Sequence, residues 1–269
     1  MSSLYDPKDR GFPEALSAID RCQIAMLREL AQSTEGRLIL KGGMAMRVAV
    51  GSMRLTKDVD FDRAEGVSTA SVQSSLKKAL QYAAQSAGLR GAEIDPGKST
   101  GTTVRMRLAG SVSGAQLRFV VEVSGRNPVP KNCQTRVLVT PPARYGIAPF
   151  AITTYTHEML AASKVLAVMS ANRNVPRDVH DLNDLLALDP ASILAARLRP
   201  VDLQDIWNQV LDKVCVIDFA QAQQELLPYI PPDQRLALTE QRWDEMTLNV
   251  AQTVQTWVSR ALQVQAGPA

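Results

Sequence analysis

Cysteine and histidine are scarce in this sequence. Of its 269 residues, three are cysteine and two are histidine. Cys22, Cys133 and Cys215 lie far apart and form no CxxC pair, which argues against a disulfide framework and against a structural zinc site. His157 and His180 are 23 residues apart, and the chain offers neither a Ser/His/Asp nor a Cys/His arrangement. Catalysis by such a triad is therefore not expected.

A long hydrophobic run is also missing. No stretch approaches the roughly 20 apolar residues that a membrane-spanning helix needs. The first ten residues are polar and charged, which does not suit a secretory signal. The content of 45% hydrophobic and 21% charged residues is typical of a globular protein. With so few cysteines, these features predict a cytoplasmic protein.

The net charge of +3 conceals an uneven distribution. Residues 1–150 carry 21 Lys and Arg against 13 Asp and Glu, a balance of +8, whereas residues 151–269 carry 9 against 14, a balance of −5. A positive field over the first part would attract polyanions such as nucleotides or RNA. Because no dense run of Lys and Arg is present, scattered arginines that only solvate the surface remain an alternative.

The hydrophobic periodicity changes along the chain, and it predicts an α+β fold. Helical spacing is found at residues 14–34 and 68–87, and strand patterns at 37–41, 56–61, 102–108, 117–123 and 136–139, with a hairpin turn at 110–114. After residue 155 the sequence predicts helices only, at 157–171, 177–187, 202–214 and 234–263. We therefore expect a mixed-sheet domain with flanking helices over residues 1–150 and a helical domain over 151–269.

The first group of candidate site residues combines a glycine pair with two aspartates. Gly42 and Gly43 follow the first predicted strand, where their lack of a side chain would let the backbone approach a phosphate. Asp58 and Asp60 lie two apart on the next strand, so both side chains point to one face. Two adjacent carboxylates favour a cation between them, and Mg²⁺ takes oxygen ligands together with phosphates. Asp62 continues the register, either as a third member or as the solvated end of the strand.

This combination differs from the common nucleotide-binding motifs. A P-loop would need GKS or GKT after the second glycine, and no GxGxxG of a Rossmann fold is present. Glu122, within the apolar segment RFVVE, is costly to bury unless it is paired or bound to a metal. A polar residue on an open sheet face is the alternative for this position.

A second group of candidates lies in the helical part. Thr156 is the expected N-cap, which places Lys164 about two turns into a helix among small and apolar neighbours. Lys164 either extends outward to solvent or reaches into a cleft. Asp178 and Asp181 share one face of the following helix, where a surface ladder of salt bridges is the alternative to a functional site.

Taken as a set, these motifs resemble a known family. The segment LKGGMAMR at 40–47, followed by DVDF at 58–61, is similar to the start of AbiEii/AbiGii-type nucleotidyltransferase toxins. Further motifs follow in the same order, namely Glu158, Lys164, Arg173 and RDVHDL at 177–182. The resemblance covers residues 38–186 and implies a DNA polymerase β-like nucleotidyltransferase fold followed by a helical domain.

The resemblance also implies an activity. A nucleoside monophosphate would be transferred from an NTP, with Mg²⁺, to an acceptor that in such toxins can be the 3′ end of tRNA, and an antitoxin would be encoded separately. Matched by position, Gly42 and Gly43 correspond to the phosphate-side motif and Asp58 and Asp60 to the metal pair. The family's lysine, which would hold the triphosphate, corresponds to Lys164, and its late aspartate to Asp178 in preference to Asp181. The remaining expected contacts are Arg47 and Arg173 with the nucleotide and Glu122 with a second metal ion.

Some positions depart from the family pattern. Many relatives have Gly-Ser where this chain has Gly42 and Gly43, so backbone NH groups would have to replace the serine hydroxyl. The third carboxylate is often Asp, for which Glu122 is a longer substitute. The alternatives are an antibiotic-modifying or a protein-modifying nucleotidyltransferase, or a catalytically degenerate member that only binds nucleotide.

Overall fold

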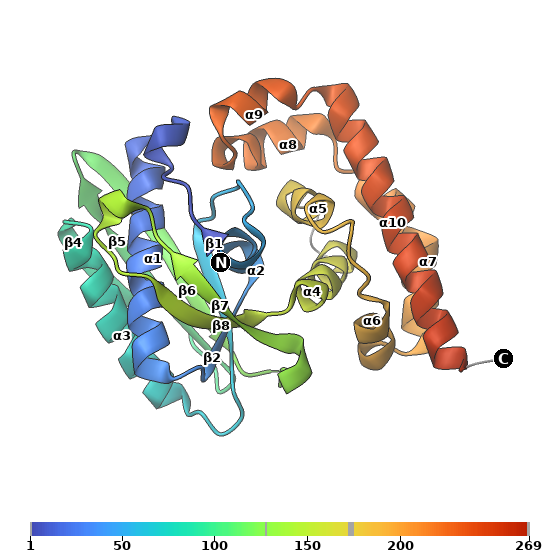
Figure 1. The fold of residues 1–269 in the computed structure, drawn as a ribbon, viewed down its shortest axis with the longest axis horizontal. Coiled ribbons are helices and arrows are strands. Elements are labelled where there is room, and N and C mark those ends of the chain that lie inside the picture. Colours follow the sequence, from blue (N-terminus) through green and yellow to red (C-terminus); the bar gives the residue numbers. More distant parts are fainter. Residues whose placement is uncertain (1, 127, 172–174, 268–269) are drawn as a thin grey trace. The chain divides into compact units, whose positions relative to one another are not determined.

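The computed structural model describes residues 2–126, 128–171 and 175–267, which form two compact units (Figure 1). The first unit comprises residues 1–155 and the second residues 156–269. The division lies five residues after the expected boundary at 150, because the strand Phe150–Tyr155 belongs to the sheet of the first unit.

The described part of the first unit contains one mixed sheet of eight strands. Their order is β1-β7-β8-β2-β3-β6-β5-β4. The pairs β1/β7, β2/β8 and β3/β6 are parallel and the others antiparallel. The predicted α+β class with a mixed sheet is therefore confirmed. The strands are β1 (Ser2–Ser3), β2 (Leu38–Lys41), β3 (Asp58–Arg63), β4 (Arg90–Pro96), β5 (Thr103–Val112), β6 (Ala115–Ser124), β7 (Gln134–Thr140) and β8 (Phe150–Tyr155).

Two long helices, α1 (Glu14–Thr34) and α3 (Thr69–Ser86), pack against each other and against the sheet (Figure 1). α1 contacts β6 and β8, and α3 contacts β5. Alternate residues of the central strands, such as Leu40, Val59 and Val121, are fully buried, and they form the core with the apolar stripes of the two helices. The intervening residues of these strands include the candidate carboxylates. Short turns of 3-10 helix lie at Lys8–Arg10, Lys131–Cys133 and Ala143–Tyr145.

The described part of the second unit is helical, as predicted. The long helices α7 (Pro200–Cys215) and α10 (Glu240–Ala266) pack along each other. Trp243 and Trp257 are buried, and their indole NH groups donate to the carbonyl groups of Ile217 and Leu188. The helices are α4 (His157–Met169), α5 (Pro176–Asn183), α6 (Ala191–Arg197), α7 (Pro200–Cys215), α8 (Phe219–Glu225), α9 (Pro232–Ala237) and α10 (Glu240–Ala266), with a 3-10 turn at Leu227–Tyr229.

None of the helices in the described residues combines the length and the apolar character that crossing a membrane requires.

Candidate active site

The glycine pair lies at the end of β2, where it begins the short helix α2 (Gly42–Ala45), which continues as a π-helical segment, Met46–Val50. Gly42 has a φ of +67°, and a Cβ at this position would lie 2.8 Å from Oδ2 of Asp60. A Cβ at Gly43 would lie 2.8 Å from Nη2 of Arg54. At Gly42 a side chain would be strained by the positive φ and would displace the Asp60 carboxylate, whereas at Gly43 it would require Arg54 and Thr56 to shift.

The three aspartates of β3 share one face of the sheet but differ in exposure. Asp58 is exposed, Asp60 is half-buried, and Asp62 is only 4% exposed. Lys41 of β2 is the register partner of Asp60. The exposure of Asp58 and Asp60 leaves this end of β3 accessible to a charged ligand.

Asp62 is held by partners from two other strands. Lys41 donates from Nζ to Oδ1 of Asp62 at 2.7 Å, and the hydroxyl of Tyr155 donates to Oδ2. Asp62 is therefore neither a solvated strand end nor open to a cation. Lys41 and Tyr155 were not identified from the sequence, because their contact with Asp62 depends on the pairing of β2 with β3 and β8.

Glu122 lies opposite Asp60 in the parallel pair β3/β6, as a third carboxylate would. Its Oε2 accepts hydrogen bonds from the guanidinium of Arg105 on β5, with Nε at 3.0 Å. Among residues 2–126, 128–171 and 175–267, no three acidic, histidine or cysteine side chains gather closely enough to hold a metal ion. In this structure Glu122 is therefore the ion-pair partner of Arg105, and its expected role as a ligand of a second metal ion stays a prediction.

Asp58 and Asp60 fit a Mg²⁺ ion by the chemistry of their donors. Both are hard oxygen ligands on one face of one strand, and Gly42 leaves the space that the Asp60 carboxylate needs. Mg²⁺ commonly takes one or two carboxylates and fills its other positions with water and substrate phosphates. A pair of carboxylates is therefore sufficient, and the assignment of these two residues to a metal stays a prediction.

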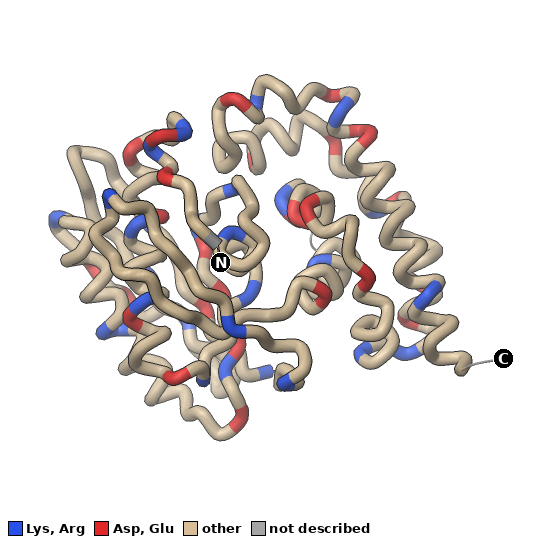
Figure 2. The backbone as a smooth tube through the Cα atoms, viewed as in Figure 1, with Lys and Arg blue, Asp and Glu red and all other residues tan. Residues whose placement is uncertain are grey.

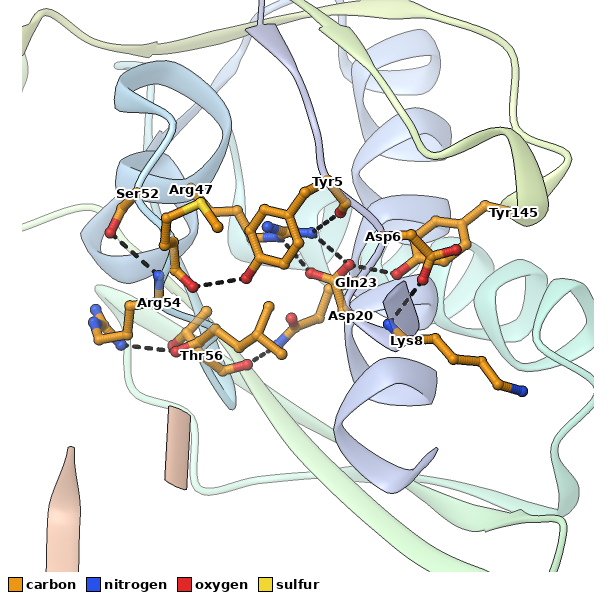
Figure 3. Close-up of polar contacts among 12 residues, drawn as sticks. Tyr5, Asp6, Lys8, Asp20, Gln23, Arg47, Ser52, Arg54, Thr56 and Tyr145 are labelled. Atoms are coloured by element: carbon orange, nitrogen blue, oxygen red, sulfur yellow. Dashed lines mark hydrogen bonds and ion pairs between the residues drawn. The ribbon is translucent and has the colours of Figure 1, made fainter. Parts of the chain in front are cut away.

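Arg47 does not have the position expected of a nucleotide contact. Its side chain is 1% exposed, and its Nε and Nη2 donate to the two carboxylate oxygens of Asp20 at 2.6 and 2.9 Å (Figure 3). Burial is the largest single effect and would lower the pKa of Arg47, but the charge and hydrogen bond of Asp20 together with Tyr5 and Tyr145 outweigh it, so the pKa is raised. The predicted contact of this guanidinium with a nucleotide is corrected accordingly, because the group is enclosed and bound within the protein.

The second unit brings Lys164, Asp178 and Asp181 together. Thr156 caps α4, as predicted, by accepting the NH of Met159 at 3.2 Å. Lys164 Nζ lies 2.8 Å from Oδ1 of Asp178 and 2.5 Å from Oδ2 of Asp181, and all three side chains are buried.

This triad is not the surface ladder that the sequence also allowed. It shows that Asp178 and Asp181 are equivalent as lysine partners, so the geometry does not favour one of them. Removal of the lysine would leave two buried carboxylates, at a cost of about 3–5 kcal/mol for a broken buried pair. Lys164 therefore has a structural role in its unit besides any contact with substrate. Arg173, the last expected contact, lies outside the described residues.

The charge of the first unit is consistent with a polyanionic ligand. Residues 151–155 add no charge, so the unit keeps the balance of +8. Figure 2 shows its Lys and Arg positions spread over several elements. Among the described residues, the positive charge is therefore distributed over several elements.

Comparison with known proteins identifies a family. A family model described as "Nucleotidyl transferase AbiEii toxin, Type IV TA system" matches residues 25–263. No curated protein sequence matches the chain.

Two solved structures from Helicobacter pylori have a similar fold. JHP933 has a TM-score of 0.58 at 16% identity, covering 95% of this chain and 97% of its own. A protein described as a candidate nucleotidyltransferase has a TM-score of 0.59 at 16% identity, covering 94% and 99%. At this identity the two structures establish the fold alone. Because the family model spans most of the sequence, the chain belongs to the AbiEii nucleotidyltransferase toxin family of type IV toxin–antitoxin systems.

Proposed function

We propose that this protein transfers a nucleoside monophosphate from an NTP to the 3′ end of tRNA and thereby inhibits growth. Mg²⁺ would be held by Asp58 and Asp60, and a separately encoded antitoxin would counteract the toxin, in keeping with the family. The observation that carries the proposal is the pair of accessible carboxylates on β3 beside Gly42, whose missing side chain leaves room for Asp60.

The charge of the first unit supports a nucleic acid as acceptor. Its balance of +8 would attract an RNA, whereas a small cationic antibiotic would be repelled. Phosphate contacts by Lys and Arg are the main source of affinity for nucleic acids and do not depend on sequence. Among the alternatives, this charge favours tRNA over an aminoglycoside-like acceptor.

The residues of the chain would act chiefly by position and charge. When bound, Mg²⁺ would offset the negative charge of the phosphates and orient them for in-line attack by the acceptor hydroxyl. Asp58 and Asp60 would fix the ion, while the backbone at Gly42 and Gly43 would allow the phosphates to approach closely. The family resemblance further assigns Lys164 to the triphosphate.

The test is a labelling reaction with a matched control. Purified protein is incubated with total tRNA, Mg²⁺ and each α-³²P-labelled NTP in turn. Asp58→Ala is compared with Asp95→Ala, which removes an exposed aspartate of the same sheet that pairs with Arg107 on β5. We expect label on tRNA with wild type and Asp95→Ala, and at least a 100-fold loss with Asp58→Ala or with EDTA.

The outcomes separate the alternatives. Label on a polypeptide or on an aminoglycoside, but not on tRNA, would overturn the acceptor while keeping the transferase. Equal labelling by wild type and Asp58→Ala would overturn the metal site. Binding of NTP without any transfer would identify a degenerate member.

A further inference from the structure

The segment that leads into β3 is irregular and yet largely buried. Residues 51–57, here called the 51–57 loop, form no helix or strand, but Ser52, Arg54, Leu55 and Thr56 are all buried. Connecting segments normally lie on the surface, because buried peptide groups need hydrogen-bond partners that water cannot supply there. Protein groups must therefore hold this loop.

Two side chains from distant parts of the sequence bind its carbonyl groups (Figure 3). The hydroxyl of Tyr5 donates to the carbonyl oxygen of Met53 at 2.7 Å. Nε2 of Gln23, on α1, donates to the carbonyl oxygen of Thr56 at 3.0 Å in a fully buried contact. Each fixes one end of the buried stretch.

Thr56 connects the restrained loop to Asp58, the first residue of β3. Its Oγ1 accepts the NH of Asp58 at 3.3 Å and lies 3.2 Å from the carbonyl oxygen of Asp58. Nη1 of Arg54 donates to the carbonyl oxygen of Leu55 at 2.9 Å. The backbone of Asp58 is thus connected to α1 through two consecutive hydrogen-bonding residues, Thr56 and Gln23.

Tyr5 is itself fixed by the buried arginine. The guanidinium carbon of Arg47 lies 4.3 Å from the centroid of the Tyr5 ring, and its Nη2 donates to the Tyr5 carbonyl oxygen at 3.1 Å. Asp20 binds Arg47 and also accepts the hydroxyl of Tyr145 at 2.6 Å. Burial raises the pKa of Tyr5 to about 12, so its hydroxyl remains a donor at neutral pH.

We infer that Tyr5 and Gln23 are positioning residues that fix the 51–57 loop and, through it, the direction in which Asp58 and Asp60 present their carboxylates. The consequence for metal binding rests on the proposed function, which assigns those aspartates to Mg²⁺. Both positioning residues precede residue 25, where the match with the family begins, so family membership gives them no role.

The test uses substitutions that keep the shape of each side chain. Tyr5→Phe removes the hydroxyl and keeps the ring under Arg47, and Gln23→Met removes the amide and keeps the length. Matched controls lose a similar contact elsewhere in the first unit. Tyr82→Phe loses a hydroxyl that accepts from Arg28 at 2.9 Å, and Gln134→Met loses a bond to the carbonyl of Val129 at 2.8 Å.

Two measurements that need no turnover are made on the full chain. Amide hydrogen exchange of residues 52–60 reports on the loop, and electron paramagnetic resonance of free Mn²⁺ reports on the affinity of the carboxylate pair. In Tyr5→Phe and Gln23→Met we expect exchange about 5- to 30-fold faster, confined to residues 52–60, and a Kd for Mn²⁺ about 3- to 10-fold higher, because a carbonyl that is buried or part-buried loses its donor. The controls should match wild type in both.

Unchanged exchange at residues 52–60 would overturn the inference. So would an equal acceleration throughout the sheet, because that result would indicate general destabilisation. If wild type does not bind Mn²⁺, or if Asp58→Ala binds it as tightly as wild type, the proposed metal site is wrong. The exchange data then still decide whether Tyr5 and Gln23 hold the loop.

Discussion

At the scale of single residues, the candidate site depends on the absence of a side chain at Gly42. Its φ of +67° would strain any other residue, and a Cβ would collide with the Asp60 carboxylate at 2.8 Å. The position therefore combines a backbone requirement with a steric one. The two can be separated, because Gly88 has the same φ of +67° but open space around it.

Gly42→Ala should cost more than Gly88→Ala in both stability and activity. The strained backbone costs each variant about 1–2 kcal/mol, and the first also displaces Asp60. We expect urea denaturation to show a loss about 1–2 kcal/mol larger for Gly42→Ala, together with a drop in transfer activity of at least about tenfold that Gly88→Ala does not share. Equal losses in the two variants would mean that the contact with Asp60 is unimportant.

Buried tyrosines should make the protein sensitive to alkaline pH. Burial raises the pKa of Tyr5 to about 12, and burial together with the charge of Asp20 raises that of Tyr145. Because an unfolded tyrosine ionises near pH 10 while the folded one keeps its proton, unfolding is favoured increasingly above that pH. We expect the Tm to fall between about pH 10 and 12 and to fall less steeply in Tyr5→Phe. Parallel curves for the two proteins would contradict the contribution of Tyr5.

At the scale of elements, α3 begins at a cap that is independent of the candidate site. Oγ of Ser68 accepts the NH of Ser71 at 3.1 Å, and the helix packs on the apolar face of the sheet. Ser68→Ala should lower the free energy of unfolding by about 1 kcal/mol and leave metal-dependent transfer unchanged. The control Ser74→Ala, at an exposed position within the same helix, should be neutral or slightly stabilising. A loss of transfer in Ser68→Ala with only this small change in stability would contradict the independence of α3 from the site.

The elements that the sequence predicted are those with a strong local pattern. Residues 14–34 are α1 as expected, and the alternating segments around residues 102–124 form the hairpin β5/β6. The predicted helix 234–263 is in fact two helices, because Thr239 caps α10 after α9 has ended. The edge strand β4 was missed because almost all of its side chains are exposed and no apolar alternation marks it.

Only those features of the candidate site that depend on local sequence could be predicted. Alternate side chains of a strand point to the same face, which predicts that Asp58 and Asp60 share a face. The cap at Thr156 follows from the helical pattern of the residues after it. The partners of Asp62 and of Arg47 were not predictable, since they lie on strands and helices distant in sequence. Side-chain pairing across a fold depends on register and packing, which a single sequence does not display.

At the scale of the whole molecule, the excess of positive charge in the first unit should make RNA binding dependent on salt. If three to four phosphates are contacted, affinity for tRNA should fall roughly 40- to 150-fold between 50 and 200 mM salt. Fluorescence anisotropy with labelled tRNA over a salt series measures the slope directly. An affinity that stays constant over this range would contradict a phosphate-based acceptor site.

The pairing of β1 with β7 has a consequence for the order of events during translation. Ser2 lies opposite Val139, so the first strand acquires its neighbour only when a segment 137 residues further on has left the ribosome. Contacts of such long range form late, because closing a large loop costs entropy before any contact is gained. Tyr5 lies two residues after the end of β1, so its hydrogen bond to the 51–57 loop should also form late. A nascent or truncated chain that ends before β7 should therefore lack this restraint, and the 51–57 loop should become ordered only after most of the first unit has been synthesised.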